Sequence, residues 1–185
     1  LSKGVLGEAG TQFLGSILVT QFLTVSLERT KRDIHERTPF YLYIDEMHSF
    51  VSLSFADILS ESRKYGLAIF LTHQFLDQLH EDIRKAILGN VGTLIVFRIG
   101  TEDAETLEHE FYPTFNKEDL SMLPQYCIYI KLLIDGTVSQ PFSAMTNPLT
   151  YTKTHIKNEI ITYSRKKYGA LRKMQEICQK GRIQG

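Results

Sequence analysis

The sequence predicts an α/β fold with a mostly parallel sheet flanked by helices, because short apolar strands alternate with helical segments along the chain. The expected strands are residues 40–44, 67–71 and 93–97. Each of them is apolar throughout rather than alternating with polar residues. Continuous apolar runs of this length are typical of strands buried on both faces of a parallel sheet.

A long helix is expected before the first strand, over residues 8–33. Its apolar side chains recur at spacings of three and four residues, which places them on one face that we expect to be buried. The side chains of this face are Leu14, Ile17, Leu18, Gln21, Phe22 and Val25. Pro39 excludes a helix that runs on into the strand, because proline disfavours the helical conformation of the residue before it.

Further helices are expected over residues 55–65 and 102–111, with a polar helical stretch between them that ends at Leu88. Gly66 follows the first of these helices directly. We expect Gly66 to be its C-cap, because glycine adopts the left-handed conformation of that position without steric cost.

The end of the chain changes in character. Two β-prone runs flank Asp135-Gly136, which predicts an antiparallel hairpin with a primed turn. The sequence is therefore expected to form an α/β part over residues 1–145, which closes with this hairpin. A basic, mostly helical tail is expected over residues 146–185.

The composition is that of an ordinary soluble domain, with 185 residues of which 43% are hydrophobic and 23% charged. No apolar run reaches the length of about 18 residues that a membrane helix needs, and no secretory signal opens the chain. We therefore expect no membrane segment. The two cysteines, Cys127 and Cys178, are too far apart in sequence to suggest a disulfide framework or a zinc site, and they fit a reducing cytoplasm.

The formal charge is zero but unevenly distributed. Residues 1–152 carry 12 basic and 19 acidic side chains, a net charge of −7, whereas residues 153–185 have a net charge of +7. A basic tail of this kind is compatible with an arm that binds nucleic acid. It is equally compatible with a solvated helix that lies against the acidic part, and the sequence leaves both interpretations open.

Polar side chains follow each expected strand. Asp45 and Glu46 come after the first strand, His73 and Gln74 after the second, and Arg98 after the third. In open parallel sheets, ligands bind beyond the carboxyl ends of the strands. The sequence therefore predicts a ligand site at one edge of the sheet.

An apolar strand followed by Asp45-Glu46 has the form of a Walker B motif. In such a motif the strand directs the aspartate at a Mg²⁺ ion on the β- and γ-phosphates of a nucleotide, and the glutamate polarises the attacking water. Gln74, at the neighbouring strand end, is suited to sense the γ-phosphate or to orient water. The same acid pair is also a common helix N-cap with a first-turn acid, so the motif alone is not decisive.

Two further features bear on nucleotide chemistry. Arg63 ends the helix before the second strand, where it either complements the helix dipole or reaches a nucleotide held by a neighbouring subunit. No G-x-x-x-x-G-K-[ST] loop is present, and the chain contains no Gly-Lys dipeptide. Because that loop supplies the amides and the lysine that hold phosphates, we do not expect this chain alone to bind ATP tightly.

The ordered set of motifs resembles the HerA–FtsK superfamily, and most closely its conjugative coupling and type IV secretion branches. Four segments carry the resemblance. They are the N-terminal Leu1-Ser2-Lys3-Gly4, the run Tyr41-Leu42-Tyr43-Ile44-Asp45-Glu46-Met47-His48, the stretch from Leu59-Ser60-Glu61-Ser62-Arg63 to Leu71-Thr72-His73-Gln74, and the run from Gly89-Asn90 to Phe97-Arg98 and Asp103-Ala104. The resemblance covers about residues 1–145 and starts after the position of the phosphate-binding loop.

This resemblance implies a RecA-like core that forms a hexameric ring, hydrolyses ATP with Mg²⁺ between subunits, and moves DNA or a DNA–protein substrate. Asp45 would then serve the Mg²⁺ ion through water, Glu46 would activate water, and Gln74 would be the sensor. Arg63 would be the finger that acts on the neighbouring subunit, and Arg98 matches a recurring position in the nucleotide site without an assigned role. The implied location is the cytoplasm or the cytoplasmic face of a membrane, with conjugation or secretion components as partners.

Two other functions remain open. A non-catalytic interaction module with a degenerate ATPase fold would explain the missing phosphate loop, although the joint presence of Asp45, Glu46, Arg63 and Gln74 argues against decay. A metal-dependent nuclease would need Asp103 to converge with Asp45 and Glu46 as a third carboxylate. We expect Asp103 instead to be an acid in the first turn of a helix.

Overall fold

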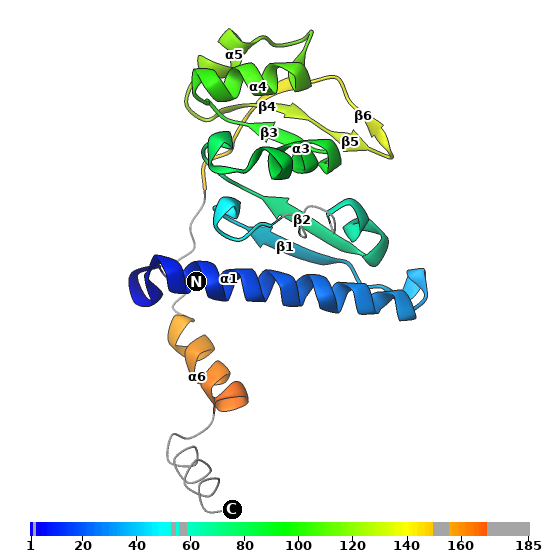
Figure 1. Cartoon of the computed structure of the whole chain (residues 1–185), viewed down its shortest axis with the longest axis vertical. Coiled ribbons are helices and arrows are strands. Elements are labelled where there is room, and N and C mark those ends of the chain that lie inside the picture. Colours follow the sequence, from blue (N-terminus) through cyan, green and yellow to red (C-terminus); the bar gives the residue numbers. More distant parts are fainter. Residues whose placement is uncertain (2, 53–54, 56–58, 150–155, 170–185) are drawn as a thin grey trace, which may run out of the picture. The chain divides into compact units, whose positions relative to one another are not determined.

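The computed structural model describes residues 1, 3–52, 55, 59–149 and 156–169, except for the side chains of Lys3 and Arg63 (Figure 1). The chain forms two compact units, Leu1–Thr146 and Asn147–Gly185. The first unit contains the helices α1, α3, α4 and α5 and all the described strands, and the second contains the helix α6.

The long N-terminal helix is confirmed, with different bounds. Helix α1 spans Lys3–Leu27 and contains one non-helical residue, Gly7, with φ of 72° and ψ of 171°. It leads into the 3-10 turn η1, Glu28–Lys31, which is followed by a second such turn, η2, Ile34–Glu36. By length and composition alone the stretch Gly4–Lys31 could cross a membrane, with a mean hydropathy of 1.2. Of its apolar window, 28% is buried in the unit, and a single helix of this kind is weak evidence for a membrane span.

The predicted buried face of α1 is wrong. The buried residues of α1 are Thr11, Gly15, Val19, Leu23 and Ser26. They follow one another every four residues, except for the last step of three. The predicted Leu14, Ile17 and Val25 are 39%, 42% and 57% exposed. The helix is apolar on most of its circumference, so its periodicity does not identify the packed side. The small residues of the buried row let the helix approach its neighbours closely.

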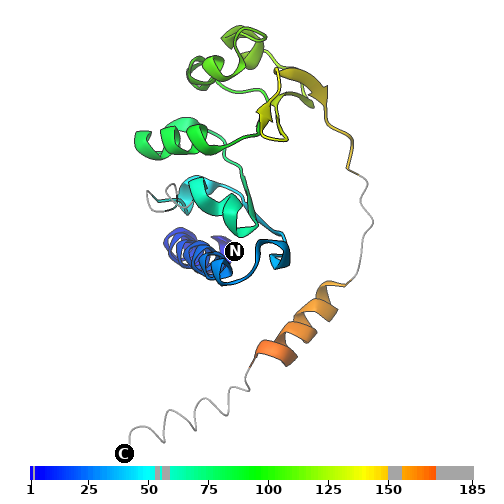
Figure 2. The same cartoon turned by 90° about the vertical axis from the view of Figure 1, so that its right-hand side faces the viewer.

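Two parallel strands form the centre of the unit. Strands β1 (Phe40–Ile44) and β2 (Leu67–Leu71) pair in register from Phe40 with Leu67 to Ile44 with Leu71. Helix α1 lies along one face of this pair (Figure 1 and Figure 2). The core on this face consists of Val19, Leu23, Ile44, Met47, Phe55, Leu67, Leu79 and Ile87.

The opposite face of the two strands is open in the described structure. Tyr41, Tyr43 and Phe70 are 58%, 70% and 46% exposed, and the rings of Tyr43 and Phe70 stack with centroids 4.5 Å apart. The prediction that β1 and β2 are buried on both faces is therefore wrong for the described chain. Helices α1 and α3 both pack in the core cluster that contains Ile44. That cluster lies on one face of the strand pair, so it does not cover the tyrosines on the other face.

The connection from β1 to β2 contains the 3-10 turns η3 (Met47–Ser49) and η4 (Ser62–Tyr65). The helix predicted over residues 55–65 falls partly on residues 56–58, which lie outside the described part of the chain. Gly66 has the expected left-handed conformation, with φ of 67°, directly before β2.

The chain continues through the 3-10 turn η5 (Leu76–Gln78) and helix α3 (Glu81–Asn90) to strand β3 (Leu94–Val96). The predicted acidic helix is confirmed as α4 (Thr101–Phe111), and α5 (Lys117–Ser121) follows it. A second core cluster joins these elements through Leu76, Val96, Ala104, Leu107, Phe111 and Leu120.

Strand β3 does not extend the parallel pair. It pairs antiparallel with β4 (Cys127–Lys131), which pairs antiparallel with β7 (Phe142–Met145). Among the described strands, parallel pairing is therefore limited to β1 and β2. The expectation that three strands end at one sheet edge is not met, because strand order depends on long-range pairing that the local sequence pattern does not specify.

The predicted hairpin is confirmed. Strands β5 (Leu133–Ile134) and β6 (Thr137–Val138) pair antiparallel around Asp135 and Gly136, whose φ angles of 49° and 82° are those of a primed turn.

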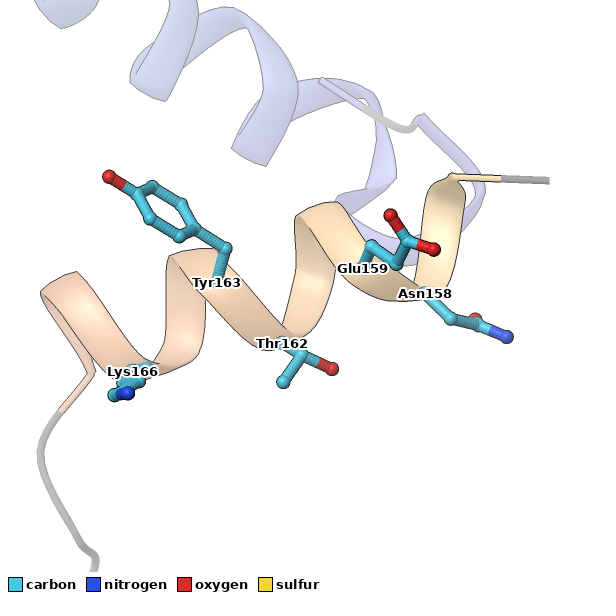
Figure 3. A pocket seen from close by; sticks show the side chains of 5 residues that line it. All are labelled: Asn158, Glu159, Thr162, Tyr163 and Lys166. Atoms are coloured by element: carbon cyan, nitrogen blue, oxygen red, sulfur yellow. The ribbon is translucent and has the colours of Figure 1, made fainter. Parts of the chain in front are cut away.

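The second unit contributes one described helix, α6 (Lys157–Tyr168), with Arg165, Lys166 and Lys167 in its last turn. Figure 3 shows a shallow, open depression on α6 that is lined by Asn158, Glu159, Thr162, Tyr163 and Lys166. All five side chains come from one exposed helix and include no predicted site residue, so the depression is not a candidate catalytic site.

Candidate functional site

The carboxyl ends of β1 and β2 are held together beyond the sheet. The Thr72 amide donates to the carbonyl of Ile44 at 3.0 Å, and the Met47 amide donates to the carbonyl of Thr72 at 2.9 Å. The segments 45–47 and 72–74 therefore leave the sheet side by side. As the sequence predicted, the polar residues after the first two strands come together, since parallel strands end at the same edge.

Asp45 is exposed and fixed by two hydrogen bonds to one carboxylate oxygen. The hydroxyl of Thr72 donates to Oδ1 at 2.5 Å, and the backbone amide of Glu46 donates to the same oxygen at 3.1 Å. Oδ2 makes no hydrogen bond with a described residue. A carboxylate with a fixed orientation and a solvent-facing oxygen is suited to hold a hydrated divalent cation, because Mg²⁺ prefers oxygen ligands and keeps several of its waters.

Glu46 has a left-handed backbone, with φ of 51° and ψ of 51°. This conformation is uncommon for a residue with a side chain, and such outliers occur often at functional sites. Its carboxylate contacts two side chains. Gln74 Nε2 donates to Oε1 at 2.7 Å, and His48 Nδ1 lies 3.6 Å from Oε2.

The segments that follow the two strands also carry two histidines with buried ring nitrogens. The Nδ1 atoms of His48 and His73 are buried and have no hydrogen-bond partner among the described residues. Burial lowers the pKa of His73 below its usual 6.5. This burial favours the neutral form of His73.

Asp103 does not join the acid pair as a third ligand. It is 7% exposed, and both of its carboxylate oxygens accept the backbone amide of Leu76 at 3.2 Å. Asp103 is in the first turn of α4, as predicted, but it also ties that helix to the segment after β2. Within the described ranges, no group of three His, Cys, Asp or Glu side chains converges as a metal site.

Of the two arginines predicted as site residues, the structure describes the side chain of Arg98 but not that of Arg63. The backbone of Arg63 lies in η4, three residues before Gly66, and its side chain lies outside the described part. Arg98 follows β3, which belongs to the antiparallel sheet, and its exposed side chain forms no hydrogen bond or ion pair with a described residue. The structure therefore brings together Asp45, Glu46 and Gln74, and it does not bring Arg98 into their hydrogen-bond network.

Sequence reasoning missed Thr72 and His48. The parallel register could have identified Thr72, because the residue after β2 lies opposite the residue after β1. His48 is two residues after Glu46, and only the tight turn η3 brings its ring back to the carboxylate. No local sequence signal predicts that contact.

Comparisons with known proteins agree with this architecture. Residues 39–109 match the family model described as "TraM recognition site of TraD and TraG". No match was found among curated protein sequences.

Solved structures of a bacterial conjugative coupling protein, TrwB, have a similar fold. Its unbound form is 16% identical, with a TM-score of 0.58, and the match covers 76% of this chain and 39% of that chain. The same protein in complex with ADP and Mg²⁺ is 17% identical, with a TM-score of 0.57 over 77% of this chain and 39% of that chain. This chain thus spans less than half the length of the TrwB structures.

At this identity the structural likeness concerns the fold, and it reproduces the α/β arrangement that the sequence predicted. The family match covers both parallel strands, the segments that follow them, and α3, β3 and most of α4. Asp45 and Glu46 lie within it. Over residues 39–109 the chain is thus similar to the TraD and TraG family model, and its fold is similar to that of the conjugative coupling protein TrwB.

Proposed function

We propose that this chain provides the Walker B and sensor half of an ATP-hydrolysis site in a conjugation-type DNA motor. The observation that carries the proposal is the link between Glu46 and Gln74, next to an Asp45 carboxylate that Thr72 holds in place. A water-activating acid, a neutral amide and a cation-binding acid thus share one edge of a parallel strand pair. Phosphoryl transfer depends mainly on this kind of positioning and electrostatic stabilisation.

The residues present fit Mg²⁺ and ATP as cofactors. The solvent-facing Asp45 oxygen would hold the ion through water, and bound Mg²⁺ neutralises charge that develops on the phosphates. Gln74 would turn its amide toward the γ-phosphate, which would release Oε1 of Glu46 to accept a hydrogen bond from the attacking water. Asp45 lies one residue away and remains fixed by Thr72 during this change.

The rest of the site would come from outside these elements. A phosphate-binding loop would come from another segment, and Arg63 would act on the nucleotide of a neighbouring subunit in a hexameric ring. Arg98 remains a proposed member of the nucleotide site. We place the motor in the cytoplasm or at the cytoplasmic face of a membrane, with DNA as its substrate. TrwB, a structural relative, is described as a coupling protein in conjugation and as binding ADP with Mg²⁺.

Partner recognition is a second candidate function. The matching family model is described as a recognition site for TraM in TraD and TraG. A conjugation component would then bind to the same residues, 39–109, that contain the acid pair. This function does not require turnover, so it would persist in variants that abolish ATP hydrolysis.

The test is ATP hydrolysis by the intact protein, with the chain in its natural sequence context. Glu46→Gln is expected to bind Mg²⁺–ATP and to lose turnover by about a hundredfold or more, because it removes the base and keeps the shape of the side chain. Glu105→Gln is the matched control, since this exposed acid on α4 pairs with Lys117. Unchanged turnover in Glu46→Gln would refute the proposed site.

The intersubunit role of Arg63 has its own test. Arg63→Ala and Glu46→Gln proteins are each expected to be inactive. Mixed rings would contain interfaces that combine an intact Glu46 with an intact Arg63 from the neighbour. Recovery of turnover on mixing supports action in trans, and no recovery in rings shown to contain both variants contradicts it.

A further inference from the structure

One contact of the Glu46 carboxylate has no place in the function proposed so far. Gln74 binds Oε1, while the ring of His48 lies next to Oε2, with Nδ1 at 3.6 Å. That separation is longer than a hydrogen bond, for which about 3.2 Å is the usual limit, yet it is short enough for a small rotation of the side chain to form one. The side chains of Glu46 and His48 are only 31% and 20% exposed.

The surroundings of His48 favour this hydrogen bond. Its Nδ1 is buried without a partner among the described residues, and a buried polar atom left unpaired costs about 1–3 kcal/mol. Glu46 Oε2 is an acceptor 3.6 Å from this atom. The neighbouring η3 turn fixes the backbone, because the Ser49 and Phe50 amides donate to the carbonyls of Glu46 and Met47 at 3.0 and 2.9 Å.

We propose that His48 is the positioning residue for Glu46, through a hydrogen bond from Nδ1 to Oε2. This inference rests on the proposed function. When Gln74 turns to the nucleotide, Glu46 loses the donor on Oε1, and that oxygen becomes free for water. His48 keeps Oε2 in place, so the carboxylate does not rotate away from the water that it activates.

The proposal predicts an effect on turnover rather than on nucleotide binding. In the intact protein, His48→Ala is expected to lower kcat for ATP hydrolysis by about tenfold or more, since a hydrogen bond to a charged group is lost. KM for ATP is expected to stay within about twofold of the wild type, because His48 does not contact the nucleotide in this account.

Two variants of similar size separate positioning from packing. In His48→Asn the amide can occupy the place of Nδ1, so this variant is expected to recover most of the lost kcat. In His48→Gln the amide lies one carbon further out, near the place of Nε2, and kcat is expected to stay low. This comparison also serves if His48→Ala fails to fold. His80→Ala is the matched control, because His80 Nδ1 also lies 3.6 Å from a carboxylate, that of Asp82, but on an exposed surface.

The experiment measures kcat, KM and the melting temperature of these variants beside Glu46→Gln. Recovery by Asn but not by Gln, with similar melting temperatures, supports the inference. Wild-type kcat in His48→Ala, or equal recovery by Asn and Gln, overturns it while leaving the proposed function intact. If Glu46→Gln hydrolyses ATP normally, the proposed function fails, and the role of His48 fails with it.

Discussion

The side-chain amide of Gln74 donates a hydrogen bond of 2.7 Å to the Glu46 carboxylate, and this bond joins the segments that follow two neighbouring parallel strands. The two residues are 28 positions apart in the sequence. Glu46 reaches Gln74 from a left-handed backbone conformation that side-chain-bearing residues rarely adopt. The pair therefore links the acid that we propose activates water to the amide that we propose senses the nucleotide.

Removal of this amide tests the link. We expect Gln74→Ala to lower the kcat for ATP hydrolysis by about tenfold or more, because the variant loses a donor to a charged group and the contact with the γ-phosphate. Gln74→Glu should be worse, since it places a second negative charge beside Glu46. Steady-state hydrolysis by the intact protein measures both. Gln78→Ala, an exposed glutamine in η5, serves as the control, and a normal kcat in Gln74→Ala would contradict the sensor role.

The close approach of α1 to the turn after β1 gives a prediction about stability. A Cβ atom on Gly15 would lie 2.2 Å from the ring of Phe50, whereas one on Gly10 would meet only ordinary contact at 3.5 Å. Gly15→Ala is expected to lower the free energy of unfolding by about 1–3 kcal/mol, as overpacking does. Gly10→Ala should raise it by up to about 1 kcal/mol, because alanine favours the helix. Urea denaturation of both variants checks the pair, and equal effects would contradict the described packing.

The buried His73 predicts a loss of stability in mild acid. Burial lowers the pKa of His73 in the folded state below its usual value of 6.5, so the unfolded chain takes up the proton first as the pH falls. The contribution of His73 to stability is therefore complete above pH 6.5 and decreases below it, until the folded-state pKa is reached.

Denaturation at pH 7.5 and pH 5.5 measures this effect. The His73→Gln variant is expected to lose less stability between the two pH values than the wild type. His80→Gln should lose as much as the wild type, because His80 is exposed. An identical pH dependence in His73→Gln and the wild type would show that His73 is not buried as described.

Substitution of Asp103 is expected to lower the stability of the fold and not to act on catalysis. Asp103→Ala leaves the buried Leu76 amide without its acceptor, which is expected to cost about 1–3 kcal/mol of stability. Asp103→Asn retains one acceptor oxygen and should cost less. Thermal denaturation compares the two variants. Loss of a Mg²⁺-dependent DNA cleavage activity in a folded Asp103→Asn protein would instead favour a nuclease.

The local pattern of the sequence predicted the elements of the fold better than their packing. It predicted β1 and β2, α4, the hairpin turn at Asp135-Gly136, and the meeting of Asp45 with the segment after β2. It assigned the wrong face of α1, because Leu14 and Ile17 look more like core residues than Gly15 does. Close packing selects a small residue where two elements touch, and hydrophobicity alone does not report this.

The remaining differences have long-range causes. The partner of β3 is β4, which lies some 30 residues further along the chain, so no local signal distinguishes parallel from antiparallel pairing. The approach of His48 to Glu46 depends on the left-handed conformation of Glu46. The residue type glutamate does not predict this conformation. Thr72 was within reach of prediction, because parallel register alone places it opposite Asp45.

The measurement that tests the central claim most directly is ATP hydrolysis by the intact protein with and without double-stranded DNA, in the wild type and in Glu46→Gln. The account predicts turnover that DNA stimulates and that Glu46→Gln abolishes while Mg²⁺–ATP binding persists. Turnover that is absent in the wild type, or that is the same in Glu46→Gln, would contradict a motor site built on Asp45, Glu46 and Gln74.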